Sequence, residues 1–229
     1  MKIILETIDK CNINYQPMSD VHDLFCEYLI LKKHNPKKIM EIGAGAAGWA
    51  LTINELINSK ELEFVLIEDF RQTNYEGFEW WPKNGDELVD YISSKGKNFN
   101  YKWQEKYINN DQVDVFRFDA WGTSYNKLLD IVNSLVENSV ILFDDFAFNK
   151  DPDLIIMVLE LAKNKIIYPI WASEKVSCWS RSNNYSRYLK SYLEEQKDLI
   201  KDCVNLKLVR KHYTVLDIDL DIVQTQIQF

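Results

Sequence analysis

Apolar residues along this chain alternate between two patterns. Short continuous apolar runs predict strands that are buried on both faces, and apolar residues three and four positions apart predict helices. The predicted strands are 38–43, 63–68, 113–118, 139–143 and 166–171, with a weaker strand at 99–103 and a late strand or hairpin at 206–218. The predicted helices are 19–33, 46–57, 86–94, 125–136, 152–163 and 185–203.

This alternation indicates an α/β fold. We expect a Rossmann-like, doubly wound, mainly parallel sheet with helices on both faces and a C-terminal antiparallel strand addition. Because domains commonly hold about 150 residues, the 229 residues predict one domain, 1–229, with elaborations. Residues 1–35 are expected to form a helical cap. The aromatic segment within 70–98 departs from the pattern and is expected to be an insertion or lid.

The composition and charge of the chain exclude some classes of binding partner. The chain has 35 acidic and 27 basic residues, a net charge of −8, which argues against broad contact with nucleic acid. No apolar run reaches the roughly 18 residues that a membrane span needs. Scattered cysteines at 11, 26, 178 and 203 predict free thiols in a reducing, cytoplasmic compartment. We therefore expect a small-molecule ligand, no nucleic acid and no membrane; the oligomeric state stays open, with a homodimer as one alternative.

Three of the seven glycines lie in EIGAGAAG, residues 41–48, between a predicted strand and a predicted helix. Gly43 and Gly45 allow a tight turn and a close approach to a ligand. The acidic pair Glu68-Asp69 ends the next strand, about 20 residues further on, where an acid binds ribose hydroxyls. Together these features predict a cofactor that contains a nucleoside. Glu41 inside the turn suits a ligand with a cation, such as S-adenosylmethionine, better than a pyrophosphate.

Aspartates follow two further predicted strands. Asp119 comes after 113–118, and Asp144 and Asp145 come after 139–143. Ligands of open parallel sheets bind outside the carboxyl ends of the strands, so these side chains are expected to converge beside the cofactor. Three carboxylates repel one another, and a hard divalent cation such as Mg²⁺ relieves that repulsion. The alternative is that the aspartates cap the helices that follow.

The ordered segments EIGAGAAG, FVLIED, FRFDAW and ILFDDF resemble the class I S-adenosylmethionine-dependent methyltransferases, over somewhat more than half of the chain. They are similar in particular to metal-dependent small-molecule O-methyltransferases of the catechol and macrocin types. The resemblance implies that Gly43, Ala44, Gly45 and Gly48 line the cofactor, with Glu41 near its amino-acid end and Glu68, or else Asp69, on the ribose. It also implies catalytic roles for Asp119 and Asp144, which would hold Mg²⁺ together with Asp145. Ala47 stands where many members have glycine, and alanine is expected to suit the following helix.

The expected reaction is methyl transfer to a hydroxyl of a sugar or secondary metabolite, assisted by Mg²⁺. A metal-independent O- or N-methyltransferase with Asp119 or Asp144 as base is the first alternative. A nicotinamide-dependent oxidoreductase and a non-catalytic nucleoside-binding module remain as further alternatives. The histidines at 22, 34 and 212 are expected to be surface or edge residues, and His22 is the least unlikely of the three as a base. The tryptophans at 80, 81, 121 and, less strongly, 179 are expected to line the acceptor pocket.

Overall fold

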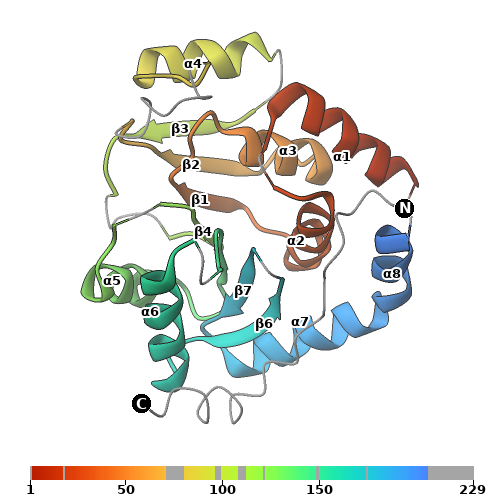
Figure 1. The fold of residues 1–229 in the computed structure, drawn as a ribbon, viewed down its shortest axis with the longest axis vertical. Helices are drawn as coiled ribbons and strands as arrows, with labels where there is room; N and C mark the ends of the chain where they lie inside the picture. Colours follow the sequence, from red (N-terminus) through yellow and green to blue (C-terminus); the bar gives the residue numbers. More distant parts are fainter. Residues whose placement is uncertain are drawn as a thin grey trace.

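A seven-stranded sheet forms the centre of the molecule, with strand order β3-β2-β1-β4-β5-β7-β6 (Figure 1). The computed structural model describes residues 2–17, 19–70, 80–95, 99–107, 112–120, 122–147, 150–173 and 175–205, with side chains up to residue 201. The strands are β1 (Lys38–Ile42), β2 (Glu63–Ile67), β3 (Tyr101–Gln104), β4 (Val115–Phe118), β5 (Val140–Phe143), β6 (Tyr168–Ala172) and β7 (Ser177–Ser180).

The first five strands pair in parallel, and β7 is antiparallel to both of its neighbours, β5 and β6. The predicted fold class is therefore confirmed. The antiparallel strand lies at Ser177–Ser180, where no strand was predicted, and the late strand predicted at 206–218 falls outside the described residues. The sequence of β7, SCWS, lacks an apolar run, yet all of its residues are buried, and Ser177 Oγ accepts a hydrogen bond from Trp179 Nε1 at 2.9 Å.

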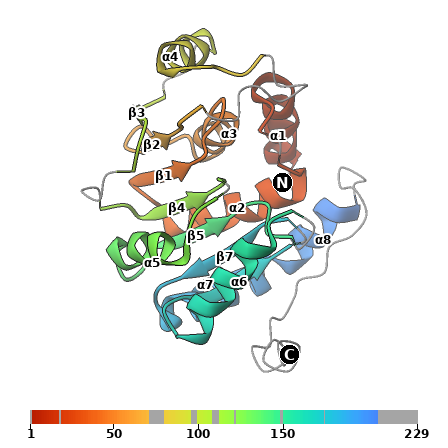
Figure 2. The same ribbon diagram turned by 60° about the vertical axis from the view of Figure 1, so that its left-hand side comes forward.

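Helices cover both faces of the sheet (Figures 1 and 2). Strand side chains alternate between two hydrophobic clusters, so that Ile39 and Phe64 join one cluster while Met40 and Val65 join the other. The first cluster includes side chains of α1 (Lys2–Tyr15), α2 (Val21–His34), α3 (Gly48–Ile57), α4 (Gly85–Ser94), α7 (Asn183–Glu195) and α8 (Lys197–Asn205). The second includes side chains of α5 (Tyr125–Ser134) and α6 (Pro152–Lys163). The helix predicted at 185–203 is thus two helices, which meet at Gln196.

Side-chain caps begin the helices that follow β4 and β5. Ser124 accepts a hydrogen bond from the backbone of Lys127 at the start of α5, and Asp151 accepts one from Leu154 at the start of α6. Because these residues satisfy the free N–H groups, the strand-end aspartates are not the caps of α5 and α6. Asp20 stands at the N-cap position of α2, but its side chain makes no capping hydrogen bond. None of the helices in the described ranges is long and apolar enough to cross a membrane.

Candidate functional site

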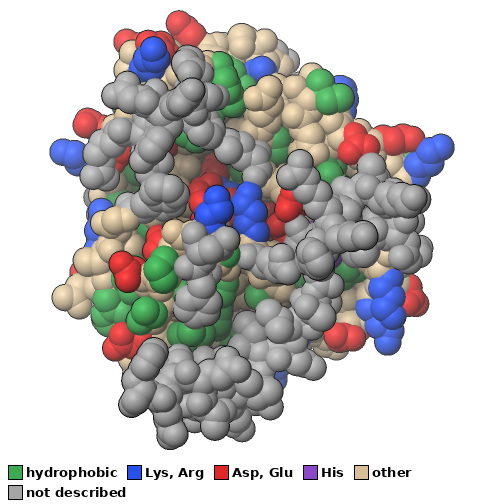
Figure 3. All heavy atoms as spheres, viewed as in Figure 1, with side chains coloured by type: hydrophobic (Ala, Val, Ile, Leu, Met, Phe, Trp, Pro, Cys, Tyr) green, Lys and Arg blue, Asp and Glu red, His purple; other side chains and the backbone are tan. Residues whose placement is uncertain are grey.

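The predicted site residues gather at one edge of the sheet, where β1, β2, β4 and β5 end. The registers of these strands place Ile42, Ile67, Phe118 and Phe143 side by side as their last residues. The glycine turn, Glu68, Asp119 and Asp144 follow directly. In Figure 3, acidic and basic side chains lie against one another near the middle of the face, in the region of β1 and β4. A cavity of about 430 Å³ lies elsewhere, beside Asn58 and Asn100 at the opposite ends of the strands.

The glycine turn depends on backbone geometry. Gly43 has a φ of 82°, its N–H donates to the carbonyl of Ile67 at 2.9 Å, and a Cβ there would lie 1.7 Å from the carbonyl oxygen of Asp119. A side chain at this position is therefore impossible without moving β4. Gly45, with a φ of 53°, lies under the ring of Trp81, 3.2 Å from where its Cβ would be. The turn is thus packed against the end of β4 and covered in part by Trp81.

Glu68 is joined to the glycine turn by hydrogen bonds. Its Oε2 accepts from the N–H of Gly45 at 2.7 Å, and its Oε1 accepts from the N–H of Phe70 at 2.9 Å. Burial raises the pKa of Glu68, while the two backbone N–H groups oppose that shift. A carboxylate has about four acceptor positions, so roughly two remain for ligand hydroxyls. Asp69, the alternative ribose-binding residue, is exposed just after the same strand.

A buried arginine, which the sequence reasoning missed, joins the carboxylates at this edge. Arg117 Nη1 donates to Glu41 Oε1 at 2.6 Å and to Asp119 Oδ2 at 2.9 Å, and its Nη2 donates to Asp144 Oδ2. We call these four residues the Arg117 cluster. Arg117 and Glu41 are each 1% exposed, Asp144 is 5% exposed, and a third of the Asp119 side chain reaches the surface.

The alternation of strand side chains between the two faces of the sheet explains how the Arg117 cluster forms. Arg117 pairs with Glu41 across β4 and β1, so the two side chains share one face of the sheet. Asp119 lies two residues after Arg117 and returns to that face. The guanidinium also lies 4.8 Å above the ring of Trp49 on α3. Trp49 Nε1 in turn donates to Glu27 of α2 at 2.8 Å, which adds a buried carboxyl behind the cluster.

Burial shifts the pKa of several groups here. It raises the pKa of Glu41 and of Glu27 to about 8, although the charge of Arg117 opposes both shifts. Burial and then repulsion by Asp144 raise the pKa of Asp119 to about 7; water at its exposed third weakens the first of these effects. Burial would lower the pKa of Arg117, but the surrounding carboxylates raise it, so the guanidinium stays protonated.

The three aspartates do not fit the expected Mg²⁺ site as they are placed. Mg²⁺ demands near-ideal octahedral oxygen geometry. The Oδ2 atoms of Asp119 and Asp144 accept from Arg117, and Asp144 Oδ1 accepts from the N–H of Asp145 at 2.8 Å. Asp145 has a φ of 51°, and its carboxylate is not among the groups that Arg117 contacts. Within the described ranges, no three His, Cys, Asp or Glu side chains are arranged to hold a metal ion.

Other predicted residues lie at the turn but face different neighbours. The N–H of Ala44 donates to the carbonyl of Ile67 at 3.2 Å, beside Gly43. A Cβ on Gly48 would lie 2.5 Å from the carbonyl oxygen of Tyr15, so this glycine lets the end of α1 approach α3. The expectation that Ala47 belongs to the following helix is wrong. Ala47 precedes α3 and has a φ of 58°, where glycine is the less strained residue.

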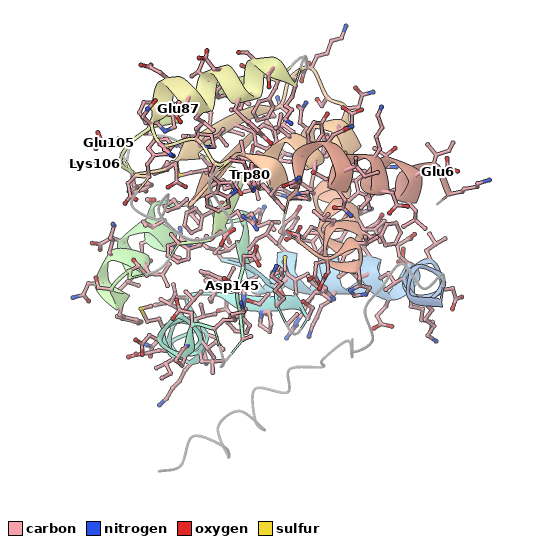
Figure 4. All side chains as sticks on the ribbon, turned by 45° about the horizontal axis from the view of Figure 1, so that its top comes forward. Glu6, Trp80, Glu87, Glu105, Lys106 and Asp145 are labelled. Carbon is pink, nitrogen blue, oxygen red and sulfur yellow. The ribbon has the colours of Figure 1, made fainter. Side chains whose placement is uncertain are left out.

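The tryptophans that were expected to line an acceptor pocket lie in different parts of the molecule. Trp80 is 40% exposed and lies 6.2 Å from Tyr91 of α4, between ring centroids. Figure 4 shows it apart from Asp145, which lies towards β6 and β7. Trp179 is fully buried in the second cluster and cannot line a pocket, and position 121 falls outside the described residues.

The two described histidines, His22 and His34, lie at opposite ends of α2. His22 lies near the carboxyl end of β6, because the centroid of its ring is 6.1 Å from that of Trp171, the next-to-last residue of that strand. His22 is buried, with its Nε2 3.7 Å from Cys26 Sγ. His34 bonds to Tyr185 Oη at 2.6 Å and to the carbonyl of Asp114 at 3.0 Å. Position 212 lies outside the described residues. A role of His22 as a base therefore stays a prediction.

Arg117 was visible in the sequence as a charged residue within an otherwise apolar strand. The segment VDVFRF places it two residues before Asp119, a spacing that puts both side chains on the same face of a strand. A charge at such a position is buried and needs a partner. Strand ends alone indicate the aspartates and not the cation between them.

Comparisons with known proteins support the fold. No family model matches the sequence, and no curated protein matches it. A methyltransferase from Podospora anserina, solved with S-adenosylhomocysteine, is 18% identical, with a TM-score of 0.53 over 78% of this chain and 87% of that one. A methyltransferase from Geobacter sulfurreducens is 13% identical, with a TM-score of 0.55 over 79% and 88%.

A third similar structure is an O-methyltransferase from Streptomyces achromogenes, involved in tomaymycin synthesis and solved with S-adenosylmethionine. It is 11% identical, with a TM-score of 0.53 over 78% of this chain and 90% of that one. The chain has the fold of the S-adenosylmethionine-dependent methyltransferases, and the resemblance drawn from its motifs is confirmed at the level of the fold.

Proposed function

We propose that this chain is an S-adenosylmethionine-dependent methyltransferase that acts on a hydroxyl of a small molecule. The observation that carries the proposal is the contact between Glu68 and the glycine turn: one carboxylate lies 2.7 Å from the N–H of Gly45, at the carboxyl end of β2. That is the place where an acid binds ribose hydroxyls in open parallel sheets. The similar structures of this fold, two of which hold the cofactor or its product, support the same interpretation.

The residues present fit the cofactor. Gly43 and Gly45 leave the backbone of the turn without side chains, and Glu68 retains acceptor positions for the ribose. When bound, S-adenosylmethionine supplies an electrophilic methyl group on a sulfonium ion. Trp81, which lies over Gly45, helps to cover the turn and exclude water from it. Glu41, expected near the amino-acid end of the cofactor, instead accepts a hydrogen bond from Arg117 Nη1 at 2.6 Å.

We assign the proton transfer to Asp119. Its side chain is the exposed member of the Arg117 cluster, and a pKa of about 7 leaves a substantial fraction ionised at neutral pH. The acceptor hydroxyl would lose its proton to an Asp119 oxygen while its own oxygen forms the new bond to the methyl carbon. The bond from that carbon to sulfur would break at the same time, and its electron pair would leave on sulfur, which gives neutral S-adenosylhomocysteine. Asp144 holds the guanidinium from the other side and so fixes the position of Asp119. This assignment follows the metal-independent alternative, because the aspartates do not fit Mg²⁺.

Calorimetric titration of the full chain tests the cofactor. We expect S-adenosylhomocysteine to bind and NAD not to bind. Glu68→Gln should weaken binding by about tenfold or more, since a hydrogen bond to a charged group contributes about 1.5–3 kcal/mol. Glu61→Gln is the matched control, because it makes the same change at an exposed position just before β2. Binding of NAD in place of S-adenosylhomocysteine would overturn the proposal.

A screen with hydroxyl-bearing acceptors tests the reaction itself. We expect a sugar or secondary metabolite to be methylated in the presence of S-adenosylmethionine, and Asp119→Asn to abolish the transfer. Binding of S-adenosylhomocysteine without turnover of any acceptor in a broad panel would favour a non-catalytic nucleoside-binding module. The two experiments therefore separate the cofactor from the chemistry.

A further inference from the structure

We propose that the guanidinium of Arg117 permanently occupies the place of a divalent cation among the strand-end carboxylates, so that this site neither needs nor binds a metal ion. The catalytic meaning of this inference rests on the proposed function. The inference about cation binding does not, because it can be measured without a cofactor or an acceptor.

Arg117 already contacts one oxygen of each of the two aspartates that would share a metal ion. Asp119 and Asp144 each direct Oδ2 to the guanidinium, and Asp144 Oδ1 is taken by the N–H of Asp145. A divalent ion bound by both aspartates would have to displace Arg117 or lie beside it. The second arrangement places two cations in contact within a buried site, where their repulsion is poorly screened.

Arg117 cannot readily leave. Its side chain is 1% exposed, its Nη1 donates to Glu41 Oε1 at 2.6 Å, and its guanidinium packs over Trp49 at 4.8 Å. Displacement would leave the charge buried without its partners, which is strongly unfavourable. The guanidinium is therefore a fixed part of the fold, whereas a metal ion exchanges with solvent.

The arrangement also provides what a metal ion provides electrostatically. One positive charge lies between three carboxyl groups that would otherwise repel one another. It contacts Asp119 from the buried side, and a third of that side chain remains exposed for an acceptor. Arg117 is thus a positioning residue that acts through Asp119, with no contact to the substrate required.

Removal of Arg117 should convert the cluster into a metal site. We would titrate MnCl₂ into the full chain and follow binding by calorimetry and by the Mn²⁺ electron paramagnetic resonance signal. Wild type should show no saturable site. Arg117→Ala should gain one site at least about tenfold tighter than any binding by the wild type. Asp144→Asn added to Arg117→Ala should remove that site, since it deletes a ligand.

Arg181→Ala is the matched control. Arg181 is a half-buried arginine whose Nη1 donates to the carbonyls of Asn133 and Leu135, so its loss exposes no carboxylates. This variant should bind no Mn²⁺. If Arg117→Ala folds and gains no site, the carboxylates do not form a cation site and the inference is wrong.

The wild-type titration decides the question even if Arg117→Ala fails to fold. One saturable Mn²⁺ site in the wild type, lost in Asp144→Asn, would overturn the inference. Absence of binding, together with methyl transfer that EDTA leaves unchanged, would support it. Failure of S-adenosylhomocysteine to bind would overturn the proposed function alone, because the Mn²⁺ measurements do not involve the cofactor.

Discussion

Replacement of Arg117 by methionine tests how much the buried cation contributes to stability. Methionine keeps much of the length of the side chain and its packing on Trp49, while the charge is lost. Removal of one partner from a buried ion pair costs about 3–5 kcal/mol, because the other charge stays buried. We expect a loss of this size, since three carboxyl groups share the guanidinium. For a chain of this size each kcal/mol lowers Tm by roughly 2–4 °C.

The loss should depend on pH, and its sign follows from the raised pKa values. A carboxyl whose folded-state pKa exceeds its unfolded value binds a proton more tightly when folded. Its stability contribution is complete below the unfolded pKa and is lost as pH rises through the folded pKa. In the wild type those folded values are about 8 for Glu41 and about 7 for Asp119. Without the opposing charge of Arg117 both rise, so the deficit of the variant should grow between pH 5.5 and pH 8.5.

Urea unfolding followed by tryptophan fluorescence at pH 5.5 and pH 8.5 measures both effects. The deficit of Arg117→Met should increase by at least about 1.4 kcal/mol between these pH values, which corresponds to one pKa unit. Adding Glu41→Gln should recover part of it at pH 8.5, because one buried carboxyl then no longer ionises. Arg181→Met is the control and should show no such pH dependence. A cost below about 1 kcal/mol at pH 8.5, or one independent of pH, would refute the reasoning, since a buried unpaired charge costs more.

Gly43→Ala should destabilise the fold by more than about 3 kcal/mol in the same urea assay, because the new Cβ would overlap the carbonyl of Asp119 and the alanine would have to keep a positive φ. Gly122→Ala is the control: its φ is 74° but the space around it is open, so it should cost only about 1–2 kcal/mol. Equal losses in the two variants would contradict the overlap at position 43. Ala47→Gly should raise stability by up to about 1 kcal/mol, and a loss would mean that the strain at φ 58° is relieved elsewhere. The rate of methyl transfer should rise with pH around 7 as Asp119 loses its proton. An unchanged pH profile in Asp119→Glu, or residual activity in Asp119→Asn, would mean that another group accepts the proton of the acceptor hydroxyl.

The strand and helix pattern predicted most of the fold because the parallel strands are apolar and buried on both faces. β1, β2, β4 and β5 lie where their apolar runs predict them, within two residues. β7 was missed for the opposite reason: Ser177 and Ser180 are fully buried, and their polar side chains conceal a central strand. Its position between β5 and β6 depends on long-range pairing, which no local pattern encodes.

The candidate site was predictable in position but not in its charges. Glycine spacing and strand ends located Gly43, Gly45, Glu68 and the aspartates at one edge, because the carboxyl ends of parallel strands meet there. The hypothesis of Mg²⁺ followed from counting carboxylates and from no cation being assigned to them. Arg117 was omitted from that count because it lies inside a strand, two residues before Asp119.

The alternation of side chains along a β-strand, with a period of two residues, would have identified Arg117. A residue two positions before a strand-end acid shares its face and lies directly beneath it, at the depth where a counter-ion is least hydrated. An apolar side chain at this position leaves strand-end carboxylates uncompensated, so they require an external cation or protonation. An arginine there supplies the charge from within and competes with any ion for the same oxygens. In chains of this fold, the residue two before the β4 acid should therefore indicate whether the strand-end carboxylates bind a metal, and Arg117 predicts that these do not.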